Sequence, residues 1–153
     1  MKKSIVLLFL MMASFSVNAQ ELTWHTDVNK ASDLAIKEKK SLMLFFTGSD
    51  WCGWCMRLQK EVFVTPEFAK WAKENVVLVE LDFPKRKVLA PELQKQNAEL
   101  EQMFGVRGYP TTWLVKPSKQ NTKVAFERLG SVPYIPGGPL AWQAEASRVI
   151  GKK

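Results

Sequence analysis

The chain passes from an apolar run to a pair of cysteines at Ser49-Asp50-Trp51-Cys52-Gly53-Trp54-Cys55. The apolar run, residues 41–47, predicts a buried strand, and residues 50–63 have helical character after a polar turn. Both cysteines therefore fall in the first turn of a predicted helix. Cysteines three residues apart lie there on one side of the helix, where their sulfurs can form a disulfide with little backbone movement. The sequence thus predicts a cysteine pair where a buried strand gives way to a helix.

The start of a helix gives the two cysteines different chemistry. Unpaired N–H groups and a partial positive charge at a helix N-terminus favour a thiolate and lower the thiol pKa. Cys52, at the exposed end of the turn, is the expected nucleophile. Cys55, one turn deeper, is expected to attack the mixed disulfide and release the substrate. Trp51 and Trp54 would flank the sulfurs with apolar surface for a substrate chain, with Gly53 between the cysteines.

Two other interpretations of the cysteine pair are weaker. A stabilising disulfide that closes a loop of about four residues gains roughly 2 kcal/mol, against ~4 kcal/mol or more for a long loop, so stability alone does not favour this spacing. Soft thiolates could carry a metal such as copper, but only Met56 lies beside the pair as a further ligand. A structural zinc needs about four ligands, and His25 is the single histidine. We therefore expect a redox-active Cys52–Cys55 disulfide, no metal and no other cofactor.

Length and pattern indicate one α/β domain. A chain of 153 residues, 46% of them hydrophobic, has the size and balance of a single globular domain. Helical spacing and turn signals predict helices over 30–40, 50–63, 66–73, 91–104 and 140–150. Apolar runs predict strands over 41–47, 75–82, 111–115 and 124–129, with a turn at 117–121. Thr65 with Pro66 is expected to begin the third helix and Gly105 to end the fourth. Helices that alternate with strands imply a central sheet.

Residues 1–19 are typical of a secretory signal peptide. Lys2 and Lys3 precede an apolar run from 5 to 17, and Val17-Asn18-Ala19 offers small residues for cleavage. The run, about 13 residues long, is short for a helix that spans a bilayer, which takes ~20. We expect a mature domain of residues 20–153 without a membrane span, located in a bacterial periplasm or else secreted.

The formal charge of +7 does not by itself predict a nucleic-acid partner. Basic residues are scattered along the chain, and only Lys85-Arg86-Lys87 forms a compact cluster, in a loop after Pro84. No repeated aromatic and basic motif of a nucleic-acid module accompanies this cluster. We expect an ordinary solvated surface and no nucleic-acid binding.

Two segments carry a resemblance to a known family. Residues 49–55 resemble the active-site segment of the thioredoxin superfamily, whose members carry WCxxC at this turn. Phe104-Gly105-Val106-Arg107-Gly108-Tyr109-Pro110-Thr111 resembles the segment of that family that ends in a cis-proline before a strand. The resemblance implies a thioredoxin fold, a central mixed β-sheet flanked by helices. It also implies that Pro110 is cis beside the cysteines and that Tyr109 offers backbone groups to a substrate peptide. Taken alone, Pro110 could equally be an ordinary turn proline, because few X-Pro bonds are cis.

Two further segments resemble one group of proteins within the family. Phe46-Thr47-Gly48-Ser49-Asp50 and Lys60-Glu61-Val62-Phe63 are similar to exported bacterial thioredoxin-like proteins related to the C-terminal domain of the periplasmic disulfide interchange protein. The stretch from 82 to 110 is longer than a thioredoxin needs. We expect the basic cluster within it to be a solvated insertion rather than a loop that recognises a partner.

One position departs from the family pattern. Cytosolic thioredoxins carry a buried aspartate six residues before the first cysteine, where it helps move a proton to or from the second cysteine. Phe46 occupies that position here. Glu80 or Asp82, on the adjacent strand, could transfer the proton instead. Equally, Glu80 could be a strand-edge charge and Asp82 a cap of the strand end.

Together these observations predict an exported thiol-disulfide oxidoreductase that exchanges disulfides with protein or peptide thiols. The chain carries no nucleotide-binding signature, so electrons must come from another protein, expected to be a membrane or periplasmic redox donor. We expect the protein to act as a reductase. The alternatives are a thiol oxidase or isomerase, and a non-catalytic metal- or peptide-binding module on the same fold.

Overall fold

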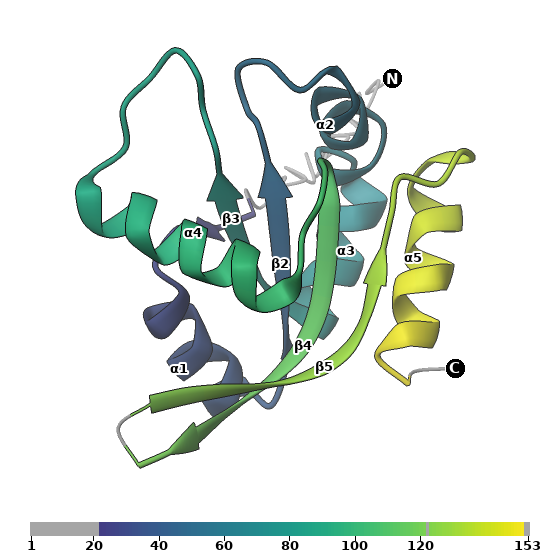
Figure 1. Ribbon diagram of the computed structural model, residues 1–153. Coiled ribbons are helices and arrows are strands. Elements are labelled where there is room, and N and C mark those ends of the chain that lie inside the picture. The colour runs from purple at the N-terminus through teal and green to yellow at the C-terminus, as the bar shows by residue number, and fades with distance from the viewer. Residues whose placement is uncertain (1–21, 122, 152–153) are drawn as a thin grey trace, which may run out of the picture.

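The computed structural model describes residues 22–121 and 123–151. The expected signal peptide, residues 1–19, lies outside the described residues. The elements are β1 (Trp24–His25), α1 (Val28–Glu38), β2 (Ser41–Thr47), α2 (Gly53–Leu58), the π-helical turn η1 (Gln59–Phe63), α3 (Pro66–Asn75), β3 (Val76–Asp82), α4 (Pro91–Phe104), β4 (Thr111–Gln120), β5 (Lys123–Val132) and α5 (Gly138–Val149). Five strands form one sheet in the order β1-β3-β2-β4-β5. Helices α1 and α4 lie on one face of this sheet, and α2, α3 and α5 lie on the other (Figure 1).

Strand β2 is the centre of the sheet. It pairs in parallel with β3 along its whole length and antiparallel with β4. Strand β1 adds in parallel to the outer edge of β3, and β5 pairs antiparallel with β4. The sheet is therefore mixed, which confirms the expected α/β architecture. Residues 42–46 of β2 are fully buried, because helices cover both faces of the sheet and leave no side for polar residues.

Alternate residues of β2 enter two separate cores. Phe45 packs in the layer of α2, α3 and α5, which also contains Cys52 and Cys55. Phe46 packs in the layer of α1 and α4, against the ring of Phe104. This division follows from the period of two along a strand. Phe46, at the position of the family's aspartate, thus lies in the opposite layer from the cysteines.

The helix-end signals in the sequence are confirmed. The Thr65 side chain accepts a hydrogen bond from the Phe68 N–H at 3.3 Å, and Pro66 is the first residue of α3. Helix α4 covers Pro91–Phe104 and ends at Gly105, whose φ of +62° lies in the left-handed region. Glycine adopts that region without the steric cost that a Cβ would bring. These ends depend on neighbouring residues alone, which explains why the sequence predicts them.

The predicted turn at 117–121 is wrong. Strand β4 continues to Gln120, and Pro117 pairs with Phe126 of β5. Pairing between β4 and β2 ends at Val115, so Pro117 has a strand partner on the β5 side and its missing N–H breaks no bond to the centre of the sheet. Strand β5 is correspondingly longer than predicted, and the two-residue strand β1 was not predicted.

The aromatic core under the cysteines should carry much of the stability. The Phe63 side chain is 2% exposed and contacts four other aromatic rings. We expect Phe63→Ala to lower the free energy of unfolding by about 3–5 kcal/mol, measured by urea denaturation, because the substitution leaves a cavity among these rings. The neighbouring Val64 is 73% exposed, so Val64→Ala should change the stability by less than about 0.5 kcal/mol. Equal effects of the two substitutions would contradict this account of the core.

Candidate active site

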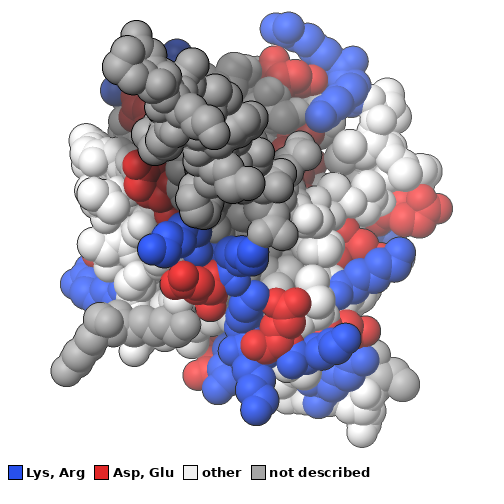
Figure 2. All heavy atoms as spheres, turned by 180° about the vertical axis from the view of Figure 1, so that it is seen from behind, with Lys and Arg blue, Asp and Glu red and all other residues white. Residues whose placement is uncertain are grey.

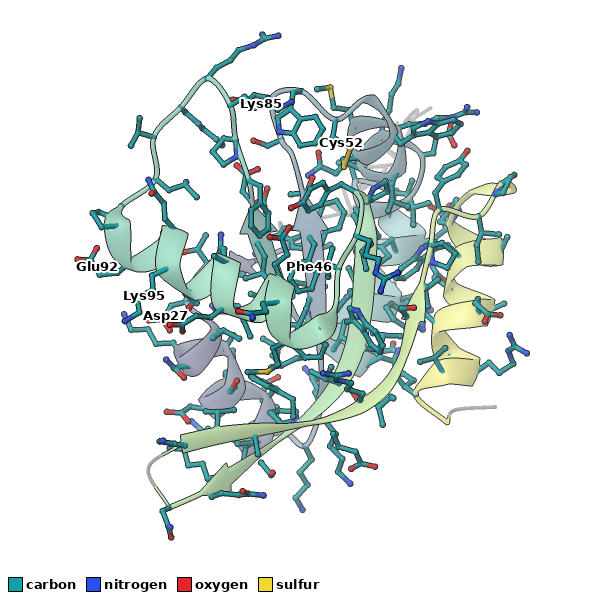
Figure 3. The ribbon with its side chains drawn as sticks, in the orientation of Figure 1. Asp27, Phe46, Cys52, Lys85, Glu92 and Lys95 are labelled. Atoms are coloured by element: carbon teal, nitrogen blue, oxygen red, sulfur yellow. A yellow bond between two sulfur atoms is a disulfide. The ribbon has the colours of Figure 1, made fainter. Side chains whose placement is uncertain are left out.

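The two cysteines lie at the start of α2, at the end of the sheet where β2 finishes (Figure 3). They form a disulfide, with the two Cα atoms 5.3 Å apart. Cys52 is the N-cap residue of α2, and its sulfur accepts a hydrogen bond from the Cys55 N–H at 3.2 Å. Cys52 is 6% exposed and Cys55 is fully buried. Cys52 is therefore slightly more exposed than Cys55, in the order expected from the sequence, and the catalytic roles of the two residues stay predictions.

The segment before β4 lies against the cysteine turn. The Tyr109–Pro110 peptide bond is cis, which agrees with the resemblance and not with an ordinary turn proline. The Tyr109 ring meets the edge of the Trp51 ring with centroids 5.7 Å apart, and it also packs on Phe83. The Tyr109 hydroxyl donates to the Glu101 carboxylate. Burial and this acceptor raise the pKa of Tyr109. The fold thus brings Tyr109 to Trp51, beside Cys52, and a substrate-binding role of Tyr109 and Pro110 stays a prediction.

The two tryptophans present different surfaces. Trp51 is 37% exposed, and its Nε1–H donates to the Phe83 carbonyl oxygen at 2.7 Å. A Cβ on Gly48 would lie only 2.4 Å from the Trp51 ring, so glycine is required for the ring to sit there. Trp54 is 56% exposed and packs on Tyr134. A Cβ on Gly53 would meet nothing within 4 Å, so the space beside Gly53 is open.

The carboxylate of Asp82 holds the cysteine turn in place. It is nearly buried and accepts hydrogen bonds from the Ser49 N–H at 2.8 Å and the Ser49 hydroxyl at 2.7 Å. The Lys87 ammonium lies 2.9 Å from the same carboxylate. Both oxygens of the Asp82 carboxylate therefore have polar partners. No local pattern in the sequence indicates Ser49 or Lys87 as its partners, because they lie on other segments.

Glu80 lies on the cysteine side of the sheet. It pairs with Phe45 across β2 and β3, so its side chain projects into the layer that contains the cysteines. Burial raises the pKa of the Glu80 carboxyl, the nearby Asp82 raises it further, and Lys87 opposes them. Among residues 22–121 and 123–151, no hydrogen bond joins Glu80 or Asp82 to a cysteine. Proton transfer by either carboxylate stays a prediction.

The basic cluster packs against the cysteine turn. We call residues 84–87 the basic loop. The Asp50 carboxylate accepts the backbone N–H of Lys85 at 2.9 Å and of Arg86 at 2.7 Å, and these bonds lower the pKa of Asp50. The Lys85 ammonium lies 4.1 Å from the centre of the Trp51 ring. The basic loop is therefore part of the site. A solvated insertion, as the sequence predicted, would not have these contacts with Asp50 and Trp51.

The described residues contain neither a metal-binding cluster nor a helix that could span a membrane. No three His, Cys, Asp or Glu side chains there are grouped so that they could hold a metal ion. No helix in that part of the chain is long and apolar enough to cross a membrane.

A cis-proline loop and a disulfide at a helix start, on a mixed sheet with helices on both faces, define a thiol-disulfide oxidoreductase of the thioredoxin fold. The model of the family described as Thioredoxin-like domain matches residues 28–132, and the chain belongs to this family.

Two relatives and one solved structure are similar to the chain in sequence. It is 32% identical to "Disulfide bond reductase DsbH" of Chlamydia pneumoniae over 78% of this chain and 72% of that protein. It is 31% identical to "Thioredoxin-related protein DsbJ" of Chlamydia pneumoniae over 80% of this chain, which spans only 34% of that relative. The structure titled "DsbH Oxidoreductase" superposes with a TM-score of 0.80 and 26% identity, covering 94% of both chains.

The oxidised C-terminal domain of DsbD from Neisseria meningitidis shares the fold. Its TM-score is 0.50 at 18% identity, over 82% of this chain and 98% of that one. The predicted resemblance to the thioredoxin superfamily is confirmed by the family model and by the relative named DsbH, and the DsbD domain shows the shared fold alone.

The buried Glu80 should make stability depend on pH in a defined direction. Its pKa is raised above the ordinary 4.5 in the folded protein, so the folded state binds more protons than the unfolded state. The free energy of unfolding must then fall as pH rises through this range. We expect Glu80→Gln, which cannot ionise, to gain stability relative to the wild type between about pH 4 and about pH 8. Urea denaturation at both pH values measures this, with Glu127→Gln, at an exposed position of β5, as the control. A constant difference across pH would contradict the prediction.

Proposed function

We propose that the chain is an exported disulfide reductase, in which Cys52 attacks substrate disulfides and Cys55 resolves the mixed disulfide. The observation that carries the proposal is the placement of the Cys52 sulfur at the N-cap of α2, in a residue that is 6% exposed, with Cys55 fully buried. A relative at 32% identity is named a disulfide bond reductase. That name supports reduction as the direction of the reaction.

The reaction begins with both cysteines reduced. The Cys52 thiolate attacks one sulfur of the substrate disulfide, the substrate S–S bond breaks, and the departing thiolate takes a proton from solvent. Cys55 then loses its proton to solvent and its thiolate attacks the Cys52 sulfur, and the second substrate thiolate leaves and takes up a proton. Two electrons pass from the dithiol to the substrate, and the Cys52–Cys55 disulfide forms. A dithiol of a donor protein must reduce this disulfide before the next turnover.

The site favours the thiolate of Cys52 in the reduced protein. The Cys55 N–H already points at the Cys52 sulfur at 3.2 Å, and a hydrogen bond to a charged acceptor is stronger than one to a neutral acceptor. The start of α2 adds its partial positive charge. Cys55 is fully buried, so it reacts only with the Cys52 sulfur once that sulfur is bound to the substrate.

The substrate and the compartment belong to the same proposal. A substrate chain lies beside Tyr109 and Pro110, where Tyr109 contacts Trp51, and the exposed Trp54 extends the apolar surface on the other side.

The leader at 1–19 directs the chain out of the cytoplasm, with the periplasm as its destination. There a membrane or periplasmic donor supplies the electrons, since an oxidising compartment would otherwise keep the pair oxidised.

Single cysteine variants should separate the two roles. Cys52→Ser is expected to abolish reduction of insulin disulfides, because it removes the nucleophile. Cys55→Ser should also stop turnover but accumulate a covalent mixed disulfide with the substrate, detected by mass spectrometry under non-reducing conditions. Turnover retained by Cys52→Ser, or by the double variant, would overturn the proposal, because the reaction would then not depend on Cys52.

The reduction potential should distinguish the direction of electron flow. Equilibration of residues 20–153 with defined thiol buffers is expected to give a potential near that of thioredoxin, about −270 mV. A value near −120 mV would instead identify an oxidant, because only a strongly oxidising couple passes its disulfide to other thiols. A pair that does not exchange at any potential would identify the non-catalytic alternative.

A further inference from the structure

The basic loop and the cysteine turn lie side by side at one end of the sheet. In Figure 1 the connection between β3 and α4 rises next to the connection between β2 and α2, and in Figure 3 Lys85 lies beside Cys52. The two N–H bonds to Asp50 hold the backbone of the loop in this position. These backbone bonds place Lys85 over Trp51, the residue that precedes Cys52. The Lys85 side chain is therefore not needed to hold the loop in this position.

The three cations of the loop differ in how far they are neutralised. Lys87 pairs with Asp82. Lys85 and Arg86 are exposed and form no ion pair among residues 22–121 and 123–151. The Asp50 carboxylate faces their backbone N–H groups rather than the Lys85 ammonium. On the back of the molecule, by contrast, basic and acidic side chains are interspersed (Figure 2). Lys85 thus leaves a positive charge at the rim of the site.

On the other side of the cysteine pair, the cation that lies over the tryptophan is paired with a carboxylate. Arg57 also lies over a tryptophan, with its guanidinium carbon 5.3 Å from the centre of the Trp54 ring. Its guanidinium pairs with Glu61 at 2.7 Å. Hydrogen bonds from Tyr134 and Arg57 lower the pKa of Glu61 and keep it ionised. The cation over Trp54 is therefore paired with a carboxylate, whereas the cation over Trp51 has no carboxylate partner among residues 22–121 and 123–151.

We propose that Lys85 binds an acidic side chain of the substrate, at a position close in sequence to the substrate cysteine that Cys52 attacks. This inference rests on the proposed function and adds a substrate class to it, disulfides in acidic peptide segments. A cation held over the residue next to the nucleophile can reach a carboxylate that flanks the attacked sulfur. Because the loop is already held by Asp50, less conformational freedom is lost when the carboxylate binds. Glu or Asp in the substrate completes the ion pair that Lys85 lacks in the part of the chain that the structure describes.

The test uses single-turnover oxidation of the reduced protein, followed by tryptophan fluorescence. The probes are two disulfide-bonded peptides that differ only in Asp or Asn beside one cysteine, and bis(2-hydroxyethyl) disulfide as a small uncharged substrate. The variant is Lys85→Gln, which keeps a long side chain over Trp51 and removes the charge. The control is Lys116→Gln, which removes one charge from an exposed lysine of β4. Lys116 lies farther along β4, away from the end of the strand that is near the cysteines.

We expect the wild type and Lys116→Gln to react with the Asp peptide about two- to five-fold faster than with the Asn peptide at low salt, the range of an exposed ion pair. Lys85→Gln should react equally with both peptides, and Lys85→Glu should prefer the Asn peptide. High salt should remove the preference in the wild type, because it screens exposed charges. All variants should react alike with the uncharged disulfide.

Two results would overturn the inference. One is an Asp preference that survives in Lys85→Gln. The other is a loss of rate in Lys85→Gln that is equal for all three disulfides, since Lys85 would then act on Cys52 and not on the substrate. A wild type that reacts with none of the disulfides would instead refute the proposed function, so the two failures are distinguishable.

Discussion

The nearly buried carboxylate of Asp82 is the contact on which the geometry of the site depends. Burial of an ionised carboxylate is costly unless its oxygens are paired. Asp82 meets this requirement with the N–H and hydroxyl of Ser49 and with the Lys87 ammonium. Ser49 belongs to the turn that carries the cysteines, and Lys87 belongs to the basic loop. One charge at the end of β3 therefore fixes the positions of both segments relative to the sheet.

Two further contacts join the same segments nearer the solvent. The Asp50 carboxylate binds the backbone of the basic loop, and the Trp51 indole donates to the Phe83 carbonyl. With Asp82, they tie three successive residues of the cysteine turn to the connection after β3. A nucleophile held in this way keeps its orientation toward an incoming disulfide, which is the requirement of a preorganised site. The freedom of the site lies instead in the exposed side chains, Trp54 and Lys85.

Patterns within a few residues predicted the fold well and the site in part. The bounds of β2 and α4 agree with prediction, as do the caps at Thr65 and Gly105, because each depends on neighbouring residues. The cysteine pair was found in the same way. The turn at 117–121 was placed wrongly, because a proline within a strand is acceptable only where the neighbouring strand is absent, and the sequence does not state where that is. Strand β1 is two residues long and forms only through its pairing with β3.

The sequence by itself determined the alternation of helices and strands, the position of the cysteines at a helix start and the exposure of Cys52 relative to Cys55. Spacing within one turn of chain sets all three. Only the tertiary structure decided that Glu80 shares a layer with the cysteines while Phe46 does not, and that the basic loop lies on Trp51. The Ser49–Asp82 bond joins residues 33 positions apart, and the Asp50–Lys85 bond joins residues 35 apart. Contacts of that range exist only after β2 and β3 have paired, so no local pattern in the chain encodes them.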